Sequence, residues 1–110
     1  MKKQLGELVP KLLSIFNHLH EHPEVSWQER ETTQFIAQIL RQEGFRPQLF
    51  KDCTGLYVEI GEGIPRVGIR ADIDALWQEV NGVMCANHSC GHDGHMTMAI
   101  GVLLLLKQLQ

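Results

Sequence analysis

The hydrophobic residues of this chain recur first with the period of a helix and later with that of a strand. Between Leu5 and His20, apolar positions lie three and four residues apart with polar positions between them, which predicts an amphipathic helix. The same period returns in a second predicted helix, from Trp27 to Glu43. Ser26 and Glu29 have the spacing of a capping box before it, and Gly44 is a natural terminator after it. The N-terminal part of the chain is therefore expected to be helical.

After residue 45 the period changes to that of extended structure. Residues 47–52, 55–62 and 65–74 are separated by turns containing glycine or proline, and three strands in a row are predicted there. Residues 75–87 have no clear period, although they contain Asn81-Gly82. They are expected to form a loop.

The last segment, residues 95–110, is apolar almost all round and is predicted to be a buried helix with Asp93 as its N-cap. Its longest apolar run, residues 99–106, has eight residues, whereas a membrane span needs about 20. Two helices, about three strands, a loop and a buried helix predict an α/β fold. The chain contains no repeat or internal boundary, so residues 1–110 are expected to form one domain or part of one.

Composition narrows the classes of partner and compartment. The 110 residues are 44% hydrophobic and 21% charged, with a net charge of −3 and no basic run, so nucleic acid is not an expected partner. Polar residues and Pro10 interrupt any signal-peptide core near the N-terminus, and no membrane association is expected. Three cysteines at uneven spacings make a poor disulfide framework and favour the cytoplasm.

The stretch HSCGHDGHM, residues 88–96, concentrates three histidines and one cysteine in nine residues. In a loop, Cys90 and His92 can turn toward one point because Gly91 relaxes the backbone between them. A thiolate and an imidazole together suit Zn, Co, Ni, Mn or Fe rather than Ca or Mg. The spacing alone also fits a small buried cysteine beside a helix start, with exposed histidines around it.

A second group of polar residues, RADID, ends the predicted third strand. In a strand Arg70, Asp72 and Asp74 point to one face. Ligands of α/β sheets gather at the carboxyl ends of strands, so the two acids are candidates for orienting a metal ligand or handling protons. An Arg70–Asp72 ion pair beside a solvated Asp74 is the simpler alternative.

These motifs together resemble the N-terminal part of the metal-dependent aminoacylase/carboxypeptidase superfamily. The branch is that of N-acyl-amino-acid amidohydrolases, including hippurate hydrolase and the plant indole-acetyl-amino-acid hydrolases. The resemblance covers essentially all 110 residues, through HEHPEVSWQE, ETTQFIAQILRQEGF, TGLYVEIG, RADIDAL and NHSCGHDGHMTMAIG. It implies the first part of a zinc-peptidase-like catalytic domain, without the dimerisation domain and the remaining catalytic residues.

The resemblance also implies roles for individual residues. Cys90 and His92 would be ligands of a centre that holds two divalent metal ions, Zn, Mn, Co or Ni, when complete. Asp72 stands where relatives carry an aspartate that supports the site, and Arg70 stands where the wider superfamily has a ligating histidine. The residues expected to support the ligands without binding metal are Arg70, Asp74, Asp93 and His95, with His88 as a further supporting or structural residue.

The implied reaction is hydrolysis of an N-acyl amino acid or related small amide by metal-activated water. Family members supply the general base from a downstream Glu-Glu pair, and this chain has no Asp or Glu after Asp93. The chain alone is therefore expected to be inactive and to self-associate, whereas a full-length relative would be a homodimer. Trp77 stands where relatives usually carry proline, which bears on the local turn and the neighbouring pocket.

Two other functions are compatible with the residues themselves. A small binding module could hold one structural metal through Cys90, His92 and His88 or His95, in which case folding depends on metal. An inert α/β interaction fragment would carry incidental cysteines. RADIDAL favours the enzyme, because neither alternative needs acids at that strand end.

Overall fold

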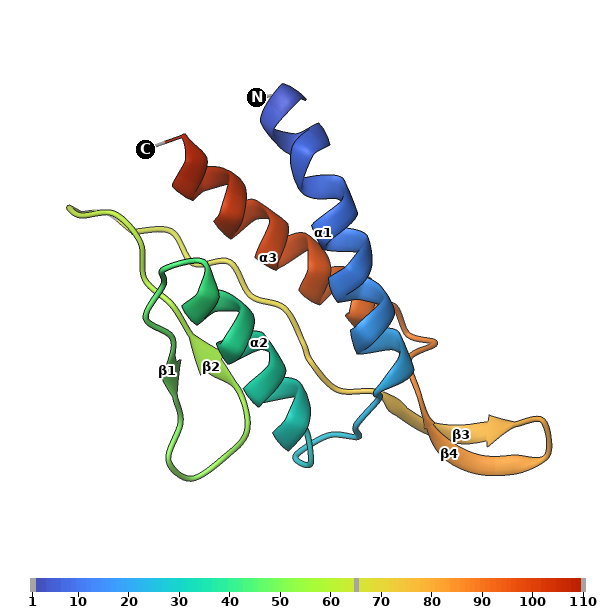
Figure 1. Ribbon diagram of the computed structural model, residues 1–110. Helices are drawn as coiled ribbons and strands as arrows, with labels where there is room; N and C mark the ends of the chain where they lie inside the picture. The colour runs from blue at the N-terminus through green and yellow to red at the C-terminus, as the bar shows by residue number, and fades with distance from the viewer. Residues whose placement is uncertain (1, 65, 110) are drawn as a thin grey trace.

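The computed structural model of the chain describes residues 2–64 and 66–109 (Figure 1). The α/β class is confirmed: three helices accompany two small antiparallel sheets. The elements in order are α1 (Lys2–Glu21), α2 (Arg30–Gln42), β1 (Gln48–Leu49), β2 (Leu56–Tyr57), β3 (Leu76–Val80), β4 (Val83–Asn87) and α3 (His92–Gln108).

The hydrophobic core lies among the three helices, where α1 and α3 run side by side (Figure 1). At Gly101 the helices approach closely, because an added Cβ atom would lie 3.1 Å from Cδ1 of Leu12. The buried apolar residues are Leu8, Ile15 and Leu19 of α1, Ile36 and Leu40 of α2, and Met96, Ile100 and Leu104 of α3. Their helical spacing confirms the amphipathic pattern predicted for α1.

The start of α2 differs from the prediction. The helix begins at Arg30 rather than Trp27, since Trp27 has a φ of 67° and belongs to a turn. The capping box of Ser26 and Glu29 is wrong. The side chain of Glu24 binds the first turn of the helix instead. Its Oε1 accepts hydrogen bonds from the amide (2.6 Å) and the hydroxyl (2.7 Å) of Thr32, and its Oε2 accepts one from the amide of Glu31 (3.2 Å). A carboxylate from outside the helix thus satisfies its first free amides.

The end of α2 follows the prediction. Gly44 has a φ of 88°, and its amide donates to the carbonyl of Arg41 at 3.0 Å. The next amide, of Phe45, donates to the carbonyl of Leu40 at 2.9 Å. These two bonds form a Schellman motif, in which a left-handed residue after the helix is favourable only for glycine.

The predicted strands are only partly formed. The first two shorten to β1 and β2, which pair with each other. Residues 66–74 of the predicted third strand join neither of the two sheets, and they run as an open trace past the helices (Figure 1). An extended segment becomes a strand only when a neighbour accepts its hydrogen bonds, so an alternating sequence was insufficient.

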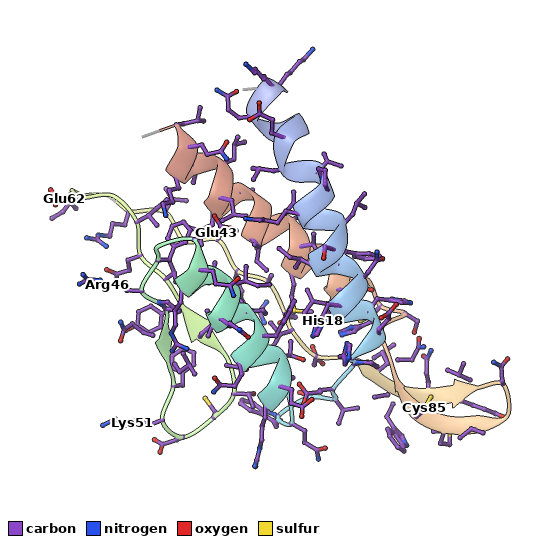
Figure 2. The ribbon with its side chains drawn as sticks, in the orientation of Figure 1. His18, Glu43, Arg46, Lys51, Glu62 and Cys85 are labelled. Carbon is purple, nitrogen blue, oxygen red and sulfur yellow. The ribbon has the colours of Figure 1, made fainter. Side chains whose placement is uncertain are left out.

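The predicted loop 75–87 is wrong, because most of it is the hairpin of β3 and β4. Asn81 and Gly82 have φ values of 53° and 83°, the signs that a two-residue type I′ turn requires. The hairpin projects from the helices and carries Cys85, as Figure 2 shows. Trp77 lies opposite Ala86 on it and is 62% exposed.

The final helix begins earlier and is less buried than predicted. Its N-cap is Gly91, so Asp93 lies within the first turn and is not the cap. Only one face is covered, and Met98 and Leu106 on the outer side are exposed. Between residues 2 and 64 and between 66 and 109, no helix has the length and apolarity needed to cross a membrane.

Replacing Gly44 with alanine should lower the free energy of unfolding by about 1–2 kcal/mol, because the left-handed conformation is strained for any residue with a Cβ atom. Urea unfolding at neutral pH measures this loss. The matched control is Gly6→Ala in α1, where an added Cβ meets nothing within 4 Å. It should stabilise the chain by about 0.5–1 kcal/mol. Destabilisation of equal size by both changes would contradict the Schellman assignment.

His18 should make stability depend on pH. Its ring stacks on Phe35 of α2, with centroids 3.7 Å apart, near the middle of the molecule (Figure 2). Burial and then the charge of His22 lower the pKa of His18 below its ordinary 6.5, against the opposing charge of Glu21. The contribution of the neutral His18 ring to the free energy of unfolding is therefore complete above pH 6.5. It is lost as the pH falls through the lower pKa of the folded state.

The variant His18→Phe keeps a stacking ring that cannot be protonated. Between about pH 7.5 and 5 its free energy of unfolding should fall less steeply than that of the parent chain. Urea titrations at several pH values compare the two slopes, and the difference between them isolates His18 from the other histidines. Parallel slopes would show that His18 has the same pKa folded and unfolded.

Candidate metal centre

The Cys-Gly-His turn joins the projecting hairpin to α3. β4 ends at Asn87, and Gly91 caps α3 with a φ of 94°. The helix begins immediately, since the amide of His95 donates to the carbonyl of Gly91 at 3.0 Å. Cys90 is exposed at this turn and His92 is the first helical residue. The local fold therefore fixes His92 and leaves the thiol of Cys90 accessible.

His92 is held from the RADID segment. Its Nδ1 lies 2.9 Å from Oδ1 and 3.0 Å from the backbone oxygen of Asp74. Both oxygens can only accept, so Nδ1 donates and carries the proton. The other nitrogen, Nε2, lies 3.8 Å from Oδ2 of Asp72. This is the arrangement in which a carboxylate fixes the tautomer of a histidine whose second nitrogen is available to a metal.

The two motifs singled out in the sequence thus meet in space. Asp72 and Asp74 both approach His92 from the same segment. Arg70 pairs with Asp72, and its side chain is 82% exposed. The Arg70–Asp72 pair of the simpler alternative is therefore present, whereas Asp74, which that alternative left solvated, contacts His92.

Asp93 makes a different contact from those considered in the sequence. Its Oδ2 accepts a hydrogen bond from Nδ1 of His20 at 2.7 Å, and it does not bind His92. Burial disfavours its charge, but the bonds from His20 and the Gly94 amide and the field of His88 outweigh burial. The pKa of Asp93 is held below its ordinary value. The pair links the end of α1 to the start of α3.

His20 was not among the predicted site residues. The only signal for it was the repeated histidine in HLHEH, residues 18–22, at the end of the first helix. Its partner Asp93 is 73 residues away, so the contact depends on the packing of α1 along α3.

His88 and His95 have opposite environments. His88 is 4% exposed, and neither ring nitrogen has a hydrogen-bond partner in the part of the chain that the structure covers. Burial, and then the competing fields of Asp93 and His20, leave the pKa of His88 below its ordinary value. His95 is exposed, with its ring centroid 6.0 Å from that of His92. His88 is thus a buried ring without partners among residues 2–64 and 66–109, and His95 is an exposed ring beside His92.

A groove of about 1050 Å³ runs beside the RADID segment and His92. Its lining includes Asp72, Asp74 and His92 together with apolar residues such as Ile36 and Ile100. A mostly apolar hollow with a few converging polar groups is the usual form of a small-molecule site. Among the residues described, no three His, Cys, Asp or Glu side chains gather closely enough to hold one metal ion.

Comparison with known proteins points to the same family as the sequence motifs. The chain is 41% identical to an N-acetyl-L-cysteine deacetylase of Bacillus subtilis over 96% of its own length and 28% of the relative. It is 34% identical to the IAA-amino acid hydrolase ILR1-like 2 of Arabidopsis thaliana, over 93% of this chain and 25% of the relative. It is 37% identical to an N-acyl-L-amino acid amidohydrolase of Geobacillus stearothermophilus, over 100% of this chain and 32% of the relative. The resemblance to the N-acyl-amino-acid amidohydrolases is confirmed.

The chain spans 28% of the first of these amidohydrolase relatives, and similar shares of the others. No protein-family profile matches the chain. No solved structure matches it either. The likeness to amidohydrolases therefore rests on these sequences, in which nearly the whole of this chain is matched.

Within this amidohydrolase-like chain, Asp93→Asn should lower the free energy of unfolding at neutral pH by about 1–3 kcal/mol. The change removes the charged acceptor of His20 at a buried position. Urea unfolding measures the effect. Asp72→Asn is the matched control, because its side chain is 40% exposed and its Arg70 partner lies at the surface. That control should change stability by no more than about 1 kcal/mol. Equal losses would mean that the His20 contact contributes nothing of its own.

Proposed function

We propose that the chain supplies part of the metal centre of an amidohydrolase that cleaves N-acyl amino acids or related small amides. The relatives support the reaction class, and one geometric observation carries the assignment to residues. Nδ1 of His92 is engaged by Asp74 at 2.9 Å, so that Nε2, which lies 3.8 Å from Oδ2 of Asp72, is the nitrogen that would bind a metal. A histidine held in this way is prepared to be a ligand.

The residues present fit a divalent metal as part of its ligand set. His92 offers an imidazole nitrogen, and Cys90 offers an accessible thiol two residues earlier. This donor pair suits Zn, Co, Ni or Mn. A complete centre would hold two ions, and its further ligands would come from outside the residues described here.

In the reaction, the residues of this chain act by orientation. When bound, the metal supplies Lewis-acid polarisation of the amide carbonyl and activation of water. Asp74 keeps the tautomer of His92, Asp72 places a negative charge beside Nε2, and Arg70 balances that charge. The groove that includes these side chains would receive the acyl group or the amino acid. None of these residues is free to act as general base, so the chain alone is proposed to be inactive.

A second candidate function is favoured by one observation, the buried His88 whose ring nitrogens have no partner among the described residues. It would suit a small module in which a structural metal completes this environment. In that case metal binding and folding would be coupled, and a chelator would unfold the chain.

The chain is also proposed to self-associate in a reducing compartment such as the cytoplasm. Val67 and Ile69 are 89% and 66% exposed on the extended segment 66–74, which joins neither sheet. Apolar side chains beside an unpaired backbone favour association with another strand. Its cysteines, which are free thiols, suit a reducing environment.

Metal titration tests the proposed centre. Zn and Co should bind weakly, and Cys90→Ser and His92→Ala should each weaken binding by more than about tenfold. A direct ligand contributes at least as much as the partner that orients it. Isothermal titration with Zn, and the thiolate absorption of bound Co, measure the affinity and the ligand type.

The control for Cys90→Ser is Cys53→Ser, which removes another exposed thiol. It should leave the affinity unchanged. Tight stoichiometric binding coupled to folding would favour the structural-metal module instead. Binding that persists in both ligand variants would reject the assignment of Cys90 and His92.

A further inference from the structure

Glu24 binds two other parts of the chain, the start of α2 a few residues later and the distant segment at Ala75. Its carboxylate binds the first turn of α2 through the amide and hydroxyl of Thr32. Its backbone oxygen accepts a hydrogen bond from the amide of Ala75 at 2.7 Å, beside an isolated parallel bridge between Val25 and Ala75. One residue therefore ties a helix end to the segment that carries RADID.

The contact with Ala75 falls next to the acid that holds His92. Ala75 is 3% exposed and directly follows Asp74. Asp74 presents two acceptors to Nδ1 of His92, its side-chain oxygen and its backbone oxygen. A shift of the backbone at residues 74 and 75 would move both acceptors together, so the position of His92's partner depends on where this segment is fixed.

The side chain of Glu24 adds a strong anchor to the few backbone hydrogen bonds that hold this segment. Residues 22–29 form neither helix nor strand, and Pro23 supplies no amide to a ladder. The charged carboxylate, by contrast, accepts three hydrogen bonds at a helix N-terminus, where bonds to a charged acceptor are strong. The position of His92 therefore depends on Asp74, that of Asp74 on the bond between Ala75 and Glu24, and that of Glu24 on its carboxylate contacts with α2.

We propose that Glu24 is a positioning residue for the metal ligand His92, acting through Ala75 and Asp74. In the metal-free chain it favours the tautomer of His92 with the proton on Nδ1. Its effect on metal affinity rests on the function proposed above, whereas its effect on the tautomer does not.

The test is nitrogen NMR of histidine-labelled, metal-free protein at a pH at which the imidazoles are neutral. In the parent chain His92 should be mainly the Nδ1–H form. In Glu24→Gln, the side-chain amide brings an NH₂ group toward the amide donors of α2, so the anchor weakens. The His92 signals should then shift toward a mixture of both tautomers, and Zn affinity should fall about tenfold.

Two further variants separate positioning from simple stability. Glu31→Gln removes a charge from the same helix turn, but its side chain is exposed and has no part in the contact with Ala75. It should leave the tautomer unchanged. Thr32→Val removes one donor to Glu24 and retains the backbone amide, so it should shift the tautomer in the same direction as Glu24→Gln with less risk to folding.

The dependence on Asp74 can be measured directly. In an Asp74→Asn background, Glu24→Gln should cause a smaller further tautomer shift, because the charged acceptor is gone and only the backbone oxygen and a neutral amide oxygen still transmit the effect. A Glu24→Gln variant that loses stability but keeps the Nδ1–H form of His92 would overturn the proposal. Absence of metal binding in the parent chain would instead reject the proposed function and leave the tautomer result standing.

Discussion

Burial of one face of α3 against α1 is the interaction on which the rest of the structure depends. The two helices come from opposite ends of the chain, and Gly101 allows Leu12 to approach closely between them. Each apolar side chain removed from water contributes about 1.5–3 kcal/mol, whereas the surface ion pairs contribute at most about 1 kcal/mol. Packing therefore sets the position of the α3 N-terminus, and the polar contacts there follow from it.

The polar contacts around that N-terminus are arranged as separate tethers. His20 reaches Asp93 from α1, and Asp74 reaches His92 from the extended segment. Two adjacent residues of α3 are thus held from two sides by different parts of the chain. This division explains why Asp93 does not orient His92: its carboxylate is already engaged by α1, and a second acid takes its place.

The sequence allowed the helices to be predicted, since they depend on local pattern, and it marked the two motifs, whose contact in space depends on the fold. It could not identify the cap of α2, because the Ser26–Glu29 spacing matches a known motif, while the carboxylate that binds comes from Glu24 outside it. The hairpin was missed for a similar reason. Asn81-Gly82 was visible, but both strands are largely exposed and lack the alternation that burial imposes. Contacts such as His20–Asp93 depend on the whole fold.

The projecting hairpin has a consequence for how the molecule opens. β3 and β4 hold each other and lie outside the helical core, and a lone two-stranded hairpin is only marginally stable in water. Such an element exchanges its amide protons through openings that do not require the helices to separate. Cys90 lies between this weakly held unit and the firmly packed α3, while His92 belongs to the helix. The two side chains proposed to bind the metal, Cys90 and His92, therefore lie on opposite sides of the boundary between the hairpin and the helical core, which open independently.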